Sequence, residues 1–164
     1  MRSQWSDYRT YFFVLMFAAG NLLLPQICHI VPSGGQMFLP IYFFTLIASY
    51  KFGIKVGLAT AILSPLLNAA LFSMPPISAL PIILIKSVLL CVIASTVANQ
   101  YKKVSMFHLL LVVLGYQVAG SLAEWAIMQN FYAATADFTI GIPGMSLQII
   151  GGWLLLKKMA MYER

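Results

Sequence analysis

Four polar side chains that could bind a small molecule are embedded in long apolar segments of this sequence. Lys86 and Glu124 are ionisable, and Asn68 and Gln148 carry amides. An ionisable group inside hydrocarbon costs at least about 2.5–3.5 kcal/mol, so it normally faces a partner inside a helix bundle. Lys86 could hold a ligand carboxylate or phosphate, and Glu124 could accept from a donor or a cation. The two amides could then orient the ligand.

Structural interpretations of the two charges stay open beside this one. Lys86 and Glu124 could form an ion pair that joins two helices, or the lysine could reach the membrane interface on its aliphatic stem. Further ligand contacts could come from residues 29–40, a polar stretch whose prolines and glycines break any long helix. His29 and Gln36 are its candidate contacts.

Two more residues flank the same predicted site. Trp125 follows Glu124 and could stack on a planar ligand, although an aromatic residue at the membrane interface is the simpler interpretation. Asp137, in the last outer loop, could contact the ligand at the rim of the site, but a solvated charge is the favoured interpretation.

The sequence lacks the motifs of the common catalytic and cofactor sites. It contains no G-x-x-x-x-G-K-[ST] loop, no G-x-S-x-G elbow and no H-E-x-x-H helix. His29 and His108 are predicted to lie on opposite sides of the membrane, so they cannot share a metal ion. We therefore expect that the chain is not an enzyme and binds neither a metal nor a cofactor of its own.

The composition predicts an integral membrane protein. Of the 164 residues, 61% are hydrophobic and 9% are charged, and the mean hydropathy is +0.88. A soluble domain has about 25% charged residues, so that class is excluded. The formal charge of +6 comes from basic residues spread along the chain, which argues against nucleic-acid binding.

Six transmembrane helices are predicted, because the apolar runs divide at turn residues and about 20 residues cross the hydrocarbon core. They form a single all-α membrane domain over residues 1–164, a six-helix bundle in which the first run is kept as a span rather than removed as a signal sequence. The expected spans are about residues 10–27, 37–50, 53–72, 80–98, 106–129 and 140–156.

The basic residues predict that both termini are cytoplasmic. With six spans, nine of the ten basic residues fall on the side of the termini, as the positive-inside rule requires. The tenth is Lys86. At 1.5 Å per residue, Lys86 and Glu124 both lie roughly 9 Å below the outer boundary. Asn68 is near that level and Gln148 is slightly deeper, so the four are expected to form one layer in the outer half.

Small residues form stripes that either pack within the bundle or dock a partner membrane subunit, since they let helices approach closely in lipid. The two candidate stripes are Ala18, Ala19 and Gly20 in the first span, and Gly53, Gly57 and Ala61 in the third.

Four segments of the chain carry a family resemblance. They are GGQMFLPIY at residues 34–42, YKFGIKVGL at 50–58, LSPLL at 63–67 and MPP at 74–76. Together they resemble the S components of energy-coupling-factor (ECF) transporters, small six-helix membrane subunits that bind vitamins and related micronutrients. The resemblance covers most of the chain and is most specific over about residues 25–98.

The resemblance implies a location and a role. Such a subunit lies in the bacterial cytoplasmic (inner) membrane, captures a scarce compound from outside and topples to release it inside. It docks on a membrane coupling subunit and two ATPases, which use the ATP. In that family the pocket lies in the outer half, and docking uses small residues of the first helix, where this chain has Ala18, Ala19 and Gly20. We expect an anionic or zwitterionic vitamin-like ligand whose acid group is held by Lys86.

Two other functions stay open. A scaffold of cell-wall elongation resembling MreD is also small and multi-spanning, but it needs no outer polar pocket. A small autonomous secondary transporter is expected to show internal repeats, and none is convincing in this sequence. The polar layer in the outer half favours the S component.

Overall fold

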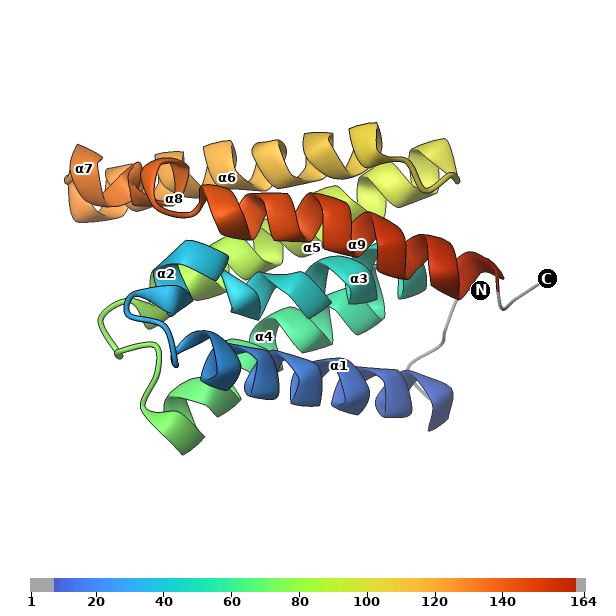
Figure 1. Cartoon of the computed structure of the whole chain (residues 1–164), viewed down its shortest axis with the longest axis horizontal. Coiled ribbons are helices and arrows are strands. Elements are labelled where there is room, and N and C mark those ends of the chain that lie inside the picture. Colours follow the sequence, from blue (N-terminus) through green and yellow to red (C-terminus); the bar gives the residue numbers. More distant parts are fainter. Residues whose placement is uncertain (1–7, 162–164) are drawn as a thin grey trace.

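Helices account for nearly all of the chain that the structure describes (Figure 1). This computed structural model describes residues 8–161, and no β-strand occurs among them. Arg2 and Arg164, which belong to the predicted cytoplasmic charges, lie outside the described residues, as do the two termini themselves. The all-α class predicted from the sequence is confirmed for the described range.

Within residues 8–161, four helices are long and apolar enough to span a membrane, which is the property expected of a multi-pass membrane protein. They match the first, third, fourth and fifth predicted spans. Their bounds are α1 (Tyr8–Cys28), α4 (Ile54–Phe72), α5 (Leu80–Tyr101) and α6 (Met106–Met128).

The second predicted span is divided into three helical pieces: α2 (Gly34–Phe38), the 3-10 helix η1 (Pro40–Tyr42) and α3 (Phe43–Phe52). The break falls at Leu39, whose φ of 47° lies in the left-handed region. Pro40 follows it, and a proline disfavours the α conformation in the residue before it. With 10 residues, α3 is only about 15 Å long, too short to cross the hydrocarbon alone.

α3 nevertheless lies at the centre of the bundle. Leu46, Ile47 and Ala48 have no exposed surface, and α3 contacts α1, α4 and α5 together with α9 (Ile142–Met161). The apolar core is therefore built around a short helix that longer helices surround.

The segment before α9 holds two short helices, α7 (Phe131–Ala134) and α8 (Ala136–Thr139), where the sequence suggests only a loop. α9 itself overlaps the sixth predicted span but begins at Ile142 and continues to Met161.

The two ends of the bundle differ. Figure 1 shows the start of α1 and the end of α9 at one end, which we call the terminal end, and α2, α7 and α8 at the other, which we call the cavity end. Apart from Lys86, every lysine of residues 8–161 is close to the first or last residue of a helix, at the terminal end of the bundle. They are Lys51, Lys55, Lys102, Lys103, Lys157 and Lys158.

A buried asparagine joins three helices. Asn21 of α1 has no exposed surface, and its Nδ2 donates to Thr45 Oγ1 of α3 and to Ser64 Oγ of α4, each at 3.0 Å. Its Oδ1 accepts a hydrogen bond from the backbone N–H of Phe44 at 3.2 Å. Asn68 of α4 extends the cluster, because its Nδ2 donates to the backbone oxygen of Asn21 at 2.9 Å. Polar groups with partners of this kind hold membrane helices together.

Asn21→Ala is expected to lower the free energy of unfolding by about 2 kcal/mol, because three side-chain hydrogen bonds are lost at roughly 0.6 kcal/mol each. Denaturant unfolding of the detergent-solubilised protein measures this difference. Asn99→Ala, at an exposed position of α5, is the matched control and should change little. Equal losses in the two variants would show that the Asn21 cluster does not hold the helices together.

Candidate functional site

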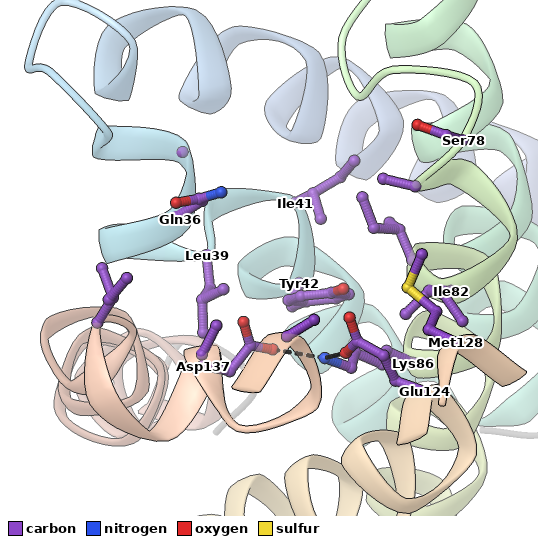
Figure 2. A pocket seen from close by; sticks show the side chains of 16 residues that line it. Gln36, Leu39, Ile41, Tyr42, Ser78, Ile82, Lys86, Glu124, Met128 and Asp137 are labelled. Carbon is purple, nitrogen blue, oxygen red and sulfur yellow. Dashed lines mark hydrogen bonds and ion pairs between the residues drawn. The ribbon is translucent and has the colours of Figure 1, made fainter. Parts of the chain in front are cut away.

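Lys86 holds two carboxylates at the cavity end of the bundle. Its Nζ lies 2.6 Å from Glu124 Oε2 and 2.8 Å from Asp137 Oδ2 (Figure 2). We call these three residues the charged triad. They come from α5, α6 and α8. Because Glu124 and Asp137 are the only acidic residues in the described range 8–161, every described carboxylate side chain binds the same ammonium group.

The interpretation of Asp137 as a solvated loop residue is wrong. Its side chain is 18% exposed and is ion-paired with Lys86. The short helices return the chain over the end of α6: the Asn130 side chain accepts a hydrogen bond from the backbone N–H of Ala133 at the start of α7. Asp137 then falls in the first turn of α8. The sequence does hold a signal for this contact. A buried lysine needs an opposite charge beside it, and residues 8–161 contain only two acidic residues that could supply one.

Gly120 on α6 makes room for the lysine. A Cβ at this position would lie 2.6 Å from Lys86 Cγ and 3.3 Å from both Cδ and Cε. These atoms belong to the stem of the lysine rather than to its mobile end. The aliphatic part of Lys86 therefore crosses α6 at a residue without a side chain.

The carboxylates are the more exposed part of the triad. The Lys86 side chain is 5% exposed, against 14% for Glu124 and 18% for Asp137. The two acids and one lysine have a formal charge of −1. Figure 2 shows the ammonium group between the two carboxylates, with Tyr42 close by.

The triad borders a cavity of about 330 Å³, which we call the triad cavity. Gln36 and Leu39 contribute from α2 and the break that follows it, Tyr42 from η1, and Met128 from the end of α6. Residues 29–40, from which further ligand contacts were expected, thus do line a cavity. Tyr42 was not among the residues singled out from the sequence, because an aromatic residue in an apolar run has no distinguishing pattern.

A second cavity, of about 480 Å³, lies beside the first, and we call it the proline cavity. Gln36, Ile41 and Ile83 are among the residues that border both cavities. Asn68 lines the proline cavity and is 1% exposed, and its Oδ1 has no hydrogen-bond partner among the described residues. The prolines that give the cavity its name are Pro25, Pro40, Pro75 and Pro76.

Five of the seven predicted ligand-contact residues therefore line one or both of two cavities. Lys86 and Glu124 line the triad cavity, Asn68 and His29 line the proline cavity, and Gln36 lines both. The equal depth expected for Lys86 and Glu124 agrees with their direct contact. The position of Asn68 on the opposite side of the shared wall was not foreseen.

The other two predicted site residues line neither of these cavities. Gln148 has no exposed surface, and its Oε1 accepts a hydrogen bond from the Tyr116 hydroxyl at 2.9 Å inside the bundle. Trp125 is 49% exposed and packs edge-to-face against Phe131, with ring centroids 6.2 Å apart. Its position fits an aromatic residue at the membrane interface.

Most of the predicted docking residues pack within the bundle. Ala18 and Ala61 are buried, a Cβ on Gly20 would meet the Phe44 ring at 2.8 Å, and one on Gly57 would meet Ser49 and Cys91. Gly53, with φ 84°, lies at the turn between α3 and α4. Ala19 is exposed on α1.

No group of three or more His, Cys, Asp and Glu residues that could hold a metal ion occurs in the described part of the chain. The triad offers one ammonium group and two carboxylates, which suits recognition by charge and hydrogen bonding. Comparisons with protein-family models, curated proteins and solved structures found no match to this chain.

Gly120→Ala is expected to lower the free energy of unfolding by about 1–3 kcal/mol, because the added methyl group displaces the Lys86 stem. Thermal unfolding in detergent measures the effect. Gly115→Ala on the same helix is the matched control: its Cβ would find Ile93 at 3.6 Å, an ordinary contact. That variant should be neutral or more stable by up to about 1 kcal/mol, as for Gly→Ala in a helix. Equal behaviour of the two variants would contradict the role assigned to Gly120.

Proposed function

We propose that this chain is the substrate-capture subunit, or S component, of an ECF-type transporter that imports a small vitamin-like micronutrient. A separate module of one coupling subunit and two ATPases energises the import. The chain lies in the bacterial cytoplasmic membrane, with six crossings and both termini in the cytoplasm. The proposal rests on the sequence resemblance and on the charged triad at the wall of a cavity.

The triad cavity is the observation that supports binding most directly. Its volume of about 330 Å³ lies at the lower end of the roughly 300–1,000 Å³ that ligand pockets occupy. Three ionisable groups border it inside a bundle of apolar helices, where charges are costly and mark functional sites. A scaffold whose role is to hold neighbouring proteins needs no such cavity.

The charge distribution supports the orientation. The lysines outside the triad gather at the terminal end, as expected for a cytoplasmic face. The cavity end, which carries the triad, then faces outward. In this arrangement α2, η1 and α3 together make the second crossing and α9 makes the sixth.

Mass spectrometry of the full chain tests the proposal. Tagged protein is solubilised gently from its own host, and the small molecules and proteins that remain bound are identified together. We expect a stoichiometric metabolite and a coupling subunit with two ATPases. Absence of any metabolite, with cell-wall synthesis proteins bound instead, would favour the scaffold.

A cavity-filling variant makes this measurement specific. Ala79 lines both cavities, so Ala79→Phe should abolish retention of the metabolite by occupying its space. Ala126→Phe adds the same side chain at an exposed position of α6 that lines neither cavity, and it should retain the metabolite. Retention by both variants would place the ligand elsewhere.

The exposed face of α1 is the part of the proposed docking region that the bundle does not cover. Ala19 lies there between Leu15 and Leu23, which are one turn away on either side and are 68% and 65% exposed. A small residue between two large ones leaves a notch into which another helix can pack closely.

Ala19→Trp is therefore expected to reduce association with the coupling subunit at least tenfold while ligand binding is unchanged. Co-purification with the co-expressed coupling module measures association. Ala126→Trp on α6 is the control and should leave association intact. Normal association of the Ala19 variant would exclude this face of α1 from docking.

A further inference from the structure

The surface that the triad presents to its cavity is anionic. Lys86 is the most buried of the three side chains and directs its Nζ at Glu124 and Asp137. An ammonium group has three hydrogens to donate, and two of them are directed at carboxylates. All three side chains line the cavity, and the two carboxylates are the more exposed groups of its charged wall.

The formal charge of the triad indicates which ligand charge would neutralise it. Two carboxylates and one ammonium group sum to −1, and an uncompensated charge is expensive in apolar surroundings. A ligand cation brings the sum to zero, whereas a ligand anion brings it to −2. Lys86 is the only lysine or arginine among the described residues that line these two cavities, and two carboxylates already bind its ammonium group.

Tyr42 adds an aromatic surface to the same cavity wall. Aromatic rings attract cations through the negative potential of their faces, and the attraction grows when water is excluded. Carboxylates and a tyrosine ring around one space thus favour a positively charged nitrogen.

Asn68 supplies an independent observation in the adjoining proline cavity. This side chain is 1% exposed, its Nδ2 donates to the backbone oxygens of Asn21 and Ser64, and its Oδ1 is without a partner among residues 8–161. The group left over is an acceptor. A buried acceptor without a partner is costly, so a hydrogen-bond donor that entered this cavity and reached Oδ1 would be stabilised there.

We infer that the ligand is an organic cation, with a protonated amine or a comparable charged nitrogen at the triad. This inference rests on the proposed function and deepens it. It replaces the expectation that Lys86 holds an acid group of the ligand. Lys86 instead neutralises one of the two carboxylates and holds both in place, while the remaining negative charge binds the cation.

Fractionated metabolites test the inference on the full-length wild-type protein. A small-molecule extract of the host is separated by ion exchange at pH 7 into cationic, neutral and anionic fractions. Thermal unfolding of the detergent-solubilised protein is then measured with each. We expect only the cationic fraction to raise Tm, because binding to the folded state stabilises it. A rise with only the neutral or anionic fraction would overturn the inference but keep the proposed function. No rise with any fraction would count against both.

Isosteric variants assign the effect to the triad. Glu124→Gln and Asp137→Asn each remove one negative charge with little change of shape. Each should require the cationic fraction at about ten- to hundredfold higher concentration for the same rise in Tm. Tyr132→Lys changes the charge by the same amount at an exposed site outside both cavities, and it should respond like the wild type.

An unchanged response of both triad variants would overturn the assignment to the triad. If either variant fails to fold, the other variant and the wild-type comparison of fractions still decide the charge of the ligand.

Discussion

The pairing of Lys86 with both described carboxylates is the constraint on which the cavity end of the molecule depends. An ammonium group without a partner is not tolerated among apolar helices, so opposite charge must be brought to it. Glu124 meets this need from α6, and Asp137 meets it from α8. The second contact requires the chain after α6 to fold back over the bundle through α7. It also requires the lysine stem to cross α6 closely, which the missing side chain of Gly120 permits. One ion cluster thus fixes three helices relative to one another.

The sequence predicts the long helices well because the length of an apolar run is itself the physical requirement for crossing a membrane. α1, α4, α5 and α6 end within three residues of the expected bounds. The second and sixth segments follow other rules. Pro40 forces a break after α2, and the position of α2 depends on Gly144 of α9, where a Cβ would lie 2.5 Å from the backbone of Phe38. A local sequence pattern does not reveal a contact between residues so far apart in the chain. The short helices α2, α7 and α8 could therefore not be predicted from the sequence.

The candidate site was predictable in depth but not in direction. Counting residues along each span places Lys86 and Glu124 at one level, and they meet. Asn68 and Gln148 are at similar levels but face other neighbours, the Asn21 cluster and Tyr116. Depth is one coordinate, and the other is the rotation of each helix about its axis. A polar face normally reveals that rotation, but these helices are apolar on nearly all sides. The partner of a single polar residue therefore depends on packing that the sequence alone does not show.

The net charge of the triad affects how easily an S component would move in the membrane. If the subunit topples in the membrane, as the resemblance implies, its charged site moves relative to the hydrocarbon, where uncompensated charge is costly. The empty triad has a formal charge of −1, and a bound monovalent cation brings it to zero. Movement of the loaded subunit then costs less than movement of the empty one. An anionic ligand would reverse that order, because the loaded site would carry more charge than the empty site. Under the proposed function, a cationic ligand would in this way favour movement of the loaded form.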